Sequence, residues 1–280
     1  MNTPQPQLPR RQPVRKKRGN LLTIGKNPSR TQFLSISVAV FVFLLLAWWL
    51  ATSGGYVKPI FLPGIDRVWD RMVALALNGT LLSDIGSSLY RIVIAFAISS
   101  VMAIVIGVLA GCYGLFKAIF EPLVDFIRYM PVVAFVPLTI LWTGTDDSQK
   151  FLVIWIGTFF QQVLMMMDAV KRVPGDFVGL GRTLGMPDHK ILLRIVIPSA
   201  LPAIWDALRI SLGWAWTWLV LAELVASTSG LGYRIVVSQR YFQTDTIIGY
   251  ILLLGILGLI TDQLMRGAER ILFRYNRRRS

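Results

Sequence analysis

The sequence predicts an all-α integral membrane protein with about six transmembrane helices and a cytoplasmic loop between the fourth and fifth helices. Of its 280 residues, 54% are hydrophobic, and the mean hydropathy is +0.58. The apolar residues are massed in blocks of about 20, which is the length a helix needs to cross roughly 30 Å of hydrocarbon. Because backbone amides cannot be left unpaired in lipid, these blocks are expected to be helices.

Each apolar run has features of its own. The expected spans are residues 33–52, 89–111, 118–142, 151–170, 203–226 and 247–264. The first run is too long for the core of a secretory signal, which favours an uncleaved span. In the second run, Gly107 and Gly111 are spaced for close helix packing. In the third run, Pro131 and Pro137 are expected to kink the helix.

The charge distribution predicts three regions and an orientation. The net charge is +14, and Lys and Arg are concentrated at both ends. We expect a disordered basic cytoplasmic tail at 1–30, a transmembrane domain at 31–265 and a basic cytoplasmic tail at 266–280. The same bias places residues 171–198 inside and residues 53–84, 143–150 and 227–245 outside. Attraction to anionic lipid accounts for the basic tails, so no binding to nucleic acid is expected.

Catalytic chemistry has little support in the sequence. The single cysteine, Cys112, and the single histidine, His189, lie far apart, so they form neither a zinc site nor a Cys/His pair. The string at 19–26 resembles a phosphate-binding loop, but Asn27 stands where Ser or Thr is required. We therefore expect no catalytic residues, no metal and no cofactor, and no ATP hydrolysis by this chain.

The polar insert at 171–198 is the most informative segment. Pro174 and Pro187 punctuate it, and Asp188 is expected to cap a short helix from about His189 to Ile197. Residues 179–186 are expected to form a small turn or helix whose glycines permit close approach to a partner. The structural alternative is an amphipathic helix lying on the membrane surface.

The insert also carries a family resemblance. Arg182-Thr183-Leu184-Gly185 is followed by Ile195-x-Ile197-Pro198 and then by Ala200-Leu201-Pro202. This order resembles the coupling loop in permeases of bacterial ATP-binding-cassette (ABC) importers of the nitrate/sulfonate/taurine/bicarbonate class. Other short motifs extend the resemblance over residues 60–265, although Gly179-Leu180-Gly181 replaces the family's Glu-Ala-Ala. The resemblance implies an ATPase-coupling loop of Gly179, Leu180, Gly181, Arg182, Thr183, Leu184, Gly185, Met186, Ile195 and Pro198.

The resemblance implies a function and partners as well. The chain would be the membrane-spanning permease subunit of an ATP-driven importer in the plasma (inner) membrane of a bacterium, multi-pass, with both termini cytoplasmic. It would form the translocation path for a small oxyanion-type solute, such as nitrate, bicarbonate, a sulfonate or taurine. Its partners would be cytoplasmic ATP-binding subunits, a second permease copy in a homodimer, an extracytoplasmic solute-binding protein and the lipid bilayer.

Charged residues within the apolar runs suggest where a solute passes. Such residues are costly in lipid and tend to face a pathway or a partner charge. The candidate path consists of Arg128, Met130, Pro131, Arg209 and Glu223. Asp125 and Asp206 each lie three residues from one of these arginines, so structural ion pairs are the alternative. A self-contained channel or ion-driven transporter is the rival function; it would need a relay of ionisable groups at mid-membrane.

Overall fold

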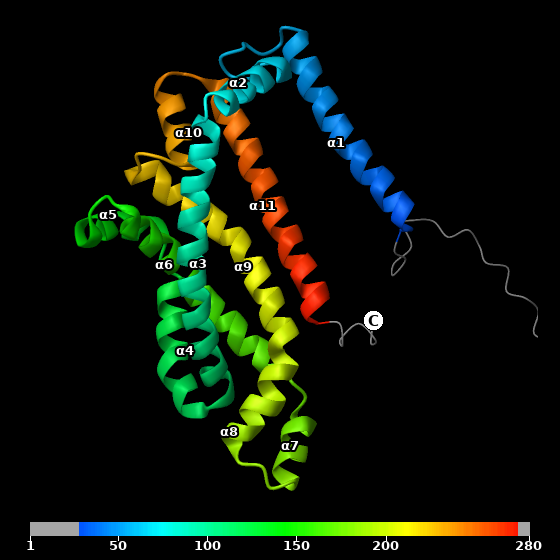
Figure 1. The fold of residues 1–280 in the computed structure, drawn as a ribbon, viewed down its shortest axis with the longest axis vertical. Helices are drawn as coiled ribbons and strands as arrows, with labels where there is room; N and C mark the ends of the chain where they lie inside the picture. The colour runs from blue at the N-terminus through cyan, green and yellow to red at the C-terminus, as the bar shows by residue number, and fades with distance from the viewer. Residues whose placement is uncertain (1–27, 274–280) are drawn as a thin grey trace, which may run out of the picture. The chain divides into compact units, whose positions relative to one another are not determined.

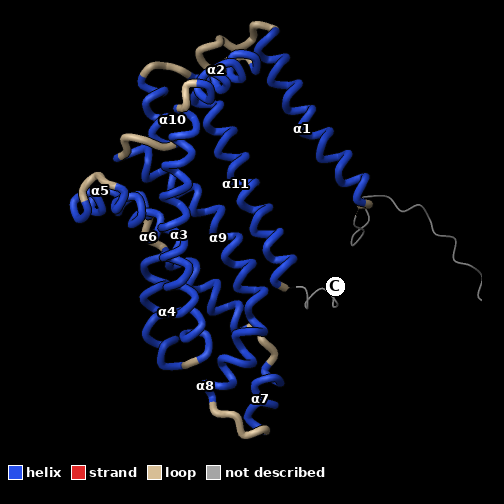
Figure 2. The backbone as a smooth tube through the Cα atoms, in the orientation of Figure 1, coloured by secondary structure: helices blue, strands red, loops and turns tan. Residues whose placement is uncertain are grey.

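A computed structural model describes residues 28–273 of the chain, and within them the secondary structure is helical, with no strand. The helices are α1 (Arg30–Ser53), α2 (Ile65–Leu77), α3 (Thr80–Cys112), α4 (Gly114–Arg128), α5 (Val132–Thr143) and α6 (Asp147–Lys171). They continue with α7 (Gly175–Thr183), α8 (Asp188–Ile191), the π-helical turn η1 (Leu192–Val196), α9 (Ile197–Ala226), α10 (Leu231–Arg240) and α11 (Thr244–Leu272). Short loops join most of them (Figure 2).

The chain divides into two compact units at Tyr56 and Val57, which we describe separately. The helix of the first unit, α1, begins at a capping box in which Ser29 and Gln32 exchange hydrogen bonds. It is apolar all round and has no buried residue. A helix of this composition is suited to lipid on every face.

Helices α3, α6 and α9 form the centre of the second unit, where they pack side by side (Figure 1). A Cβ atom on Gly107 would lie 2.4 Å from Met166 Cβ, and one on Gly111 would lie 3.2 Å from the carbonyl oxygen of Met167. Both glycines therefore let α3 approach α6 closely, as their spacing predicts. Within this unit, α7 and α8 lie at one end and α2 and α10 at the other (Figure 1).

The predicted number of spans is confirmed. Five described helices are long and apolar enough to cross a membrane, and α4 with α5 makes a sixth if the bent pair counts as one span. The bounds differ from those expected. Helix α3 begins at Thr80 instead of residue 89, and α11 continues through Leu272 into the segment expected to be a tail. Residues 1–27, including the string at 19–26, and residues 274–280 lie outside the described part.

The third expected span is two helices. Helices α4 and α5 meet at an angle of 100°. Pro131 is the N-cap of α5. Proline has no backbone N–H and disfavours helical dihedral angles in the residue before it, which explains why α4 does not continue through Pro131. Pro137 lies inside α5 and Pro122 inside α4. At 12 residues, α5 is too short to span a bilayer alone.

The expected short helix from His189 to Ile197 is wrong as a separate element. Helices α8, η1 and α9 form one continuous helix of 39 residues, Asp188–Ala226. The chain passes Pro198 because the wider π-helical turn ends just before it, where the proline ring disturbs the ladder least. Asp188 is the first helical residue and Pro187 is the N-cap, so Asp188 is not the cap.

Candidate functional site

Helix α7 is a short element held between the end of α6 and the start of α8. Pro174 is its N-cap, and it ends in a Schellman turn around Gly185, which has a φ of +70°. The amide of Met186 donates to the carbonyl of Gly181 at 3.0 Å, and the amide of Gly185 donates to that of Arg182 at 2.9 Å. A positive φ costs glycine nothing, which explains its presence at this turn.

One face of α7 packs against the same protein. A Cβ atom on Gly181 would lie 2.9 Å from Ile195 Cδ1 and 3.1 Å from Ile191 Cγ1. Val178 and Met186 join the same apolar cluster. Gly181 therefore serves close packing within the protein, whereas Gly179 and Gly185 have no atom within 4 Å of a would-be side chain.

A second face of α7 is apolar and exposed. Phe177, Leu180 and Leu184 are 40%, 59% and 69% exposed. Their spacing places them on one stripe of the helix. Such a stripe, at the end of the unit that holds α7 and α8, is a surface suited to a partner groove. Sequence reasoning omitted Phe177, although its spacing from Leu180 and Leu184 is a signal that the sequence contains.

The other residues predicted for coupling support this element. The hydroxyl of Thr183 donates to the carbonyl of Gly179 at 3.0 Å, and Arg182 Nε lies 3.9 Å from Asp188 Oδ1. Ile195 is in the packed cluster, and Pro198 lies in the first turn of α9. The segment thus brings the predicted coupling residues together, except Pro198, which belongs to the long helix.

A second feature is a cavity of about 480 Å³ at the break between α4 and α5. Three of the five candidate path residues line it, namely Arg128, Met130 and Pro131. Helices α6 and α9 complete it with Ile156, Gly157, Phe160, Gln161, Trp214, Thr217 and Trp218. The break in the span thus opens a cavity with an arginine and several aromatic rings in its wall.

The remaining two path candidates do not line this cavity. Arg209 lies 3.3 Å from Asp206, 3.7 Å from Asp262 and 3.7 Å from Glu269, which ties α9 to α11. Glu223 is 1% exposed and lies in a polar network inside the protein. The predicted pairs of Arg209 with Asp206 and of Arg128 with Asp125, the latter at 3.1 Å, are both present.

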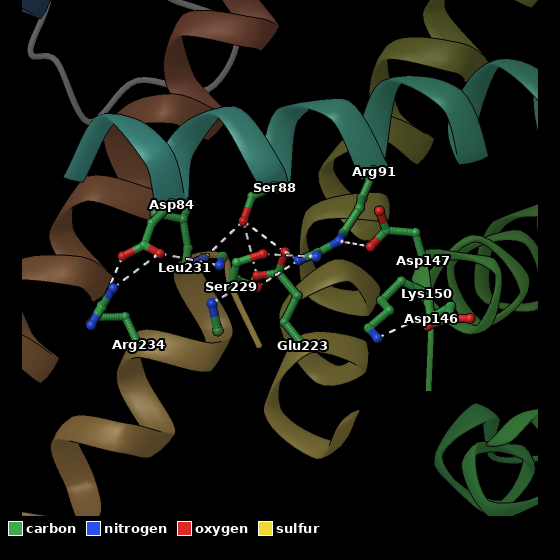
Figure 3. A network of polar contacts seen from close by, with 12 residues as sticks. Asp84, Ser88, Arg91, Asp146, Asp147, Lys150, Glu223, Ser229, Leu231 and Arg234 are labelled. Carbon is green, nitrogen blue, oxygen red and sulfur yellow. Dashed lines mark hydrogen bonds and ion pairs between the residues drawn. The ribbon is translucent and has the colours of Figure 1, made fainter. Parts of the chain in front are cut away.

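The network around Glu223 joins helices distant in sequence (Figure 3). Its carboxylate accepts hydrogen bonds from the Ser88 hydroxyl (2.8 and 2.9 Å), Arg91 Nη1 (2.8 Å) and the amide of Gly232 (2.8 Å). Arg91 also donates to Asp147 at 2.7 Å and to the carbonyl of Ser229 at 2.7 Å. Each charge of this network therefore has a partner, as a buried charge requires.

A neighbouring cluster fixes the start of α10. The amide of Gly230 donates to Asp84 Oδ1 at 3.2 Å, and Arg234 Nε and the hydroxyl of Tyr250 each donate to Asp84 Oδ2 at 2.8 Å. The hydrogen bond and charge of Asp84 raise the pKa of Arg234, against the opposing effect of burial, so Arg234 stays charged. Side chains of α3 thus hold the segment between α9 and α10 through its backbone.

Sequence reasoning singled out Glu223 but not its pairing with Arg91, which spans more than one hundred residues of sequence. Sequence reasoning also did not identify Asp84, Ser88, Asp147 or Arg234 as members of the buried network. Among residues 28–273, no group of three or more His, Cys, Asp or Glu side chains is arranged to hold a metal ion.

The helical fold and the long spans together define a multi-pass membrane protein, and the second unit carries an exposed apolar stripe on α7 at one end. The chain belongs to the family of binding-protein-dependent transport system inner membrane components, whose match covers residues 103–273. It is therefore a permease component of an ABC transporter and a transport subunit. Membership of this family implies an ATP-binding subunit and a substrate-binding protein as partners.

Individual relatives agree. A probable ABC transporter permease protein of Brucella abortus is 37% identical over 89% of this chain and 99% of that protein. The putative aliphatic sulfonates transport permease protein SsuC of Bacillus subtilis is 30% identical over 91% of this chain and 93% of that protein. A chain of the MetNI methionine ABC transporter has a TM-score of 0.61 at 19% identity, over 69% of this chain and 95% of that chain, which shows a shared fold. The predicted family resemblance is confirmed.

Proposed function

We propose that this chain forms the translocation path of an ATP-driven importer for a small oxyanion-type solute and that α7 couples it to a separate cytoplasmic ATPase. The solute class follows from the residues that resemble the nitrate, sulfonate, taurine and bicarbonate importers, and from the relative SsuC, whose name specifies aliphatic sulfonates. A second copy of this chain would complete the path as a homodimer. The protein would lie in the inner membrane with both termini cytoplasmic.

The observation that carries the proposal is the exposed apolar stripe of Phe177, Leu180 and Leu184. The basic residues around it favour a cytoplasmic location for this end of the unit, by the positive-inside rule. Exposure of an apolar stripe to water is unfavourable in free energy, and a partner that covers the stripe removes this penalty. An ATPase subunit with an apolar groove is the partner that such an element fits.

The second support is that α7 is fixed to the long helix. Gly181 packs on Ile191 and Ile195, both of which belong to the continuous helix that becomes α9. Motion imposed on α7 therefore reaches a membrane span directly. Coupling in this sense means that ATP favours one arrangement of the helices over another.

Leu180→Glu tests the proposal. The substitution places a charge on the exposed stripe without touching the packed face of α7. We expect the variant to reach the membrane in normal amounts, to lose its ATPase on purification and to lose ATP-dependent uptake of a sulfonate. The matched control is Gly179→Ala, which meets open space on the same helix and should retain both properties. Unchanged ATPase recovery with Leu180→Glu would refute the docking role of α7.

A further inference from the structure

We propose that the cavity between α4, α5, α6 and α9 binds an organic anion that carries an aromatic ring, with Arg128 facing the acidic group and Trp214 stacking on the ring. The inference deepens the proposed function, because it takes the cavity to lie on the translocation path. It selects one part of the wider oxyanion class. Four properties of the cavity lead to it.

The first property is size. The cavity measures about 480 Å³. Pockets for organic ligands span roughly 300–1,000 Å³, whereas a water molecule takes about 30 Å³ of liquid. A bare oxyanion such as bicarbonate, comparable to a few waters, would leave most of the space to water. An anion with an organic body of ring size makes better use of it.

The second property is the shape and chemistry of the wall. Four aromatic side chains line the cavity, Tyr129, Phe160, Trp214 and Trp218. Trp218 packs closely against α6 because Gly157 has no side chain: a Cβ atom there would lie 2.4 Å from Trp218 Cδ1 and Cγ. Aromatic side chains stack on a planar ring, which an aliphatic body cannot do equally well.

The third property is charge. Among the described residues that line the cavity, Arg128 is the only ionisable one apart from the phenol of Tyr129. Its Nε contacts Asp125 at 3.1 Å, its Nη2 donates to the Tyr129 hydroxyl at 2.9 Å, and its guanidinium lies 4.6 Å from the centre of the Tyr129 ring. Within the described residues its Nη1 contacts no acceptor. A guanidinium with free donors matches sulfonate and carboxylate oxygens.

The fourth property is the position of the Arg128 guanidinium, which disfavours a cationic ligand. Aromatic walls also attract cations such as quaternary ammonium groups. In this cavity the face of Tyr129 is already occupied by the Arg128 guanidinium. The guanidinium, which is also paired with Asp125, covers the ring on which a cationic ligand would otherwise sit. Gln161 and Thr217, both lining residues, supply hydrogen-bonding groups for the acidic head.

The experiment measures direct binding to the full chain in lipid nanodiscs, with empty nanodiscs as the background. The probes are benzenesulfonate, ethanesulfonate, bicarbonate and benzyltrimethylammonium. We expect benzenesulfonate to bind at least tenfold more tightly than ethanesulfonate, and bicarbonate and the ammonium probe to bind more weakly still. Equal affinity for the two sulfonates, tighter binding of bicarbonate or the ammonium probe, or no specific binding would overturn the inference.

Variants assign the binding to this cavity. Trp214→Leu should weaken benzenesulfonate binding about tenfold and leave ethanesulfonate unchanged, while Trp214→Phe should restore most of the loss because it restores a ring. Arg128→Gln should weaken both sulfonates. Trp142→Leu is the matched control, since Trp142 is an exposed tryptophan of α5 outside the lining. If Trp142→Leu and Trp214→Leu have equal effects, the site is elsewhere and the inference fails.

The binding assay and the test of coupling fail independently. If benzenesulfonate binds as expected but no ATPase accompanies the wild-type chain, the cavity assignment stands and the proposed function fails. If the ATPase is recovered but the probes bind without preference for the ring, the importer remains and the aromatic-anion assignment fails.

Discussion

Replacing Glu223 by alanine tests whether the buried network holds the protein together. The substitution removes the acceptor for Ser88, for Arg91 and for the amide of Gly232, all of which lie within 2.9 Å of the carboxylate. Arg91 keeps its contacts with Asp147 and with Ser229. The variant therefore loses one buried acceptor group and one negative charge. The positive charge of Arg91 remains, and its other two contacts compensate part of it.

The expected cost follows from these contacts. Removing one member of a buried ion pair costs about 3–5 kcal/mol, because the partner is left desolvated. Because Arg91 retains these contacts, we expect the cost in this variant to lie near the lower end of that range. Asp206→Ala is the control: its carboxylate is 50% exposed, and Arg209 keeps Asp262 and Glu269. An exposed pair contributes roughly 0–1 kcal/mol.

The assay is thermal unfolding of the purified protein in detergent. At about 2–4 °C per kcal/mol for larger chains, the Glu223→Ala variant should unfold at least about 6 °C lower, and Asp206→Ala within about 4 °C of wild type. In the double variant Arg91→Ala/Glu223→Ala, the drop in melting temperature should be smaller than the sum of the drops in the two single variants. Equal melting temperatures for Glu223→Ala and Asp206→Ala would refute the structural role. Lost uptake with an unchanged melting temperature would instead place Glu223 on the path.

Three further outcomes are expected. Gly107→Val should lower the melting temperature by several degrees, since overpacking costs about 1–3 kcal/mol, whereas Gly86→Val on the same helix, with no atom within 4 Å of a would-be Cβ, should be nearly neutral. At Gly185, whose φ is +70°, asparagine should support uptake better than valine, because it tolerates the left-handed region; equal uptake would contradict the turn geometry. In a cysteine-free background, an impermeant thiol reagent should label Ser148→Cys in intact cells and Asp188→Cys only after permeabilisation; labelling of position 188 from outside would overturn the orientation.

Composition was sufficient to predict the number of spans but not their ends. Hydropathy places the start of the second span near residue 89, because the preceding turns contain polar groups such as Asp84 and Ser88. In the structure these side chains face other helices and are buried. A polar residue inside a protein and one in a loop have the same hydropathy, so the boundary at Thr80 was not predictable from composition.

The site was predicted where its residues are close in sequence. The segment proposed for coupling is contiguous, so its position followed from motif order and spacing, and the stripe that begins at Phe177 has the spacing of a helix. The pairing of Arg91 with Glu223 depends on how α3 and α9 pack, which no local pattern specifies. The π-helical turn before Pro198 has no sequence signature either, because proline more often marks a helix end.

The continuous helix from Asp188 to Ala226 acts as a single rod through the protein. Its 39 residues extend roughly 58 Å at about 1.5 Å per residue, nearly twice the hydrocarbon thickness. One end packs against α7 and the other carries Glu223, which is tied to the segment before α10. A tilt imposed at the α7 end would be carried along the continuous helix to the opposite end, with the π-helical turn and Pro202 as places where the helix can flex.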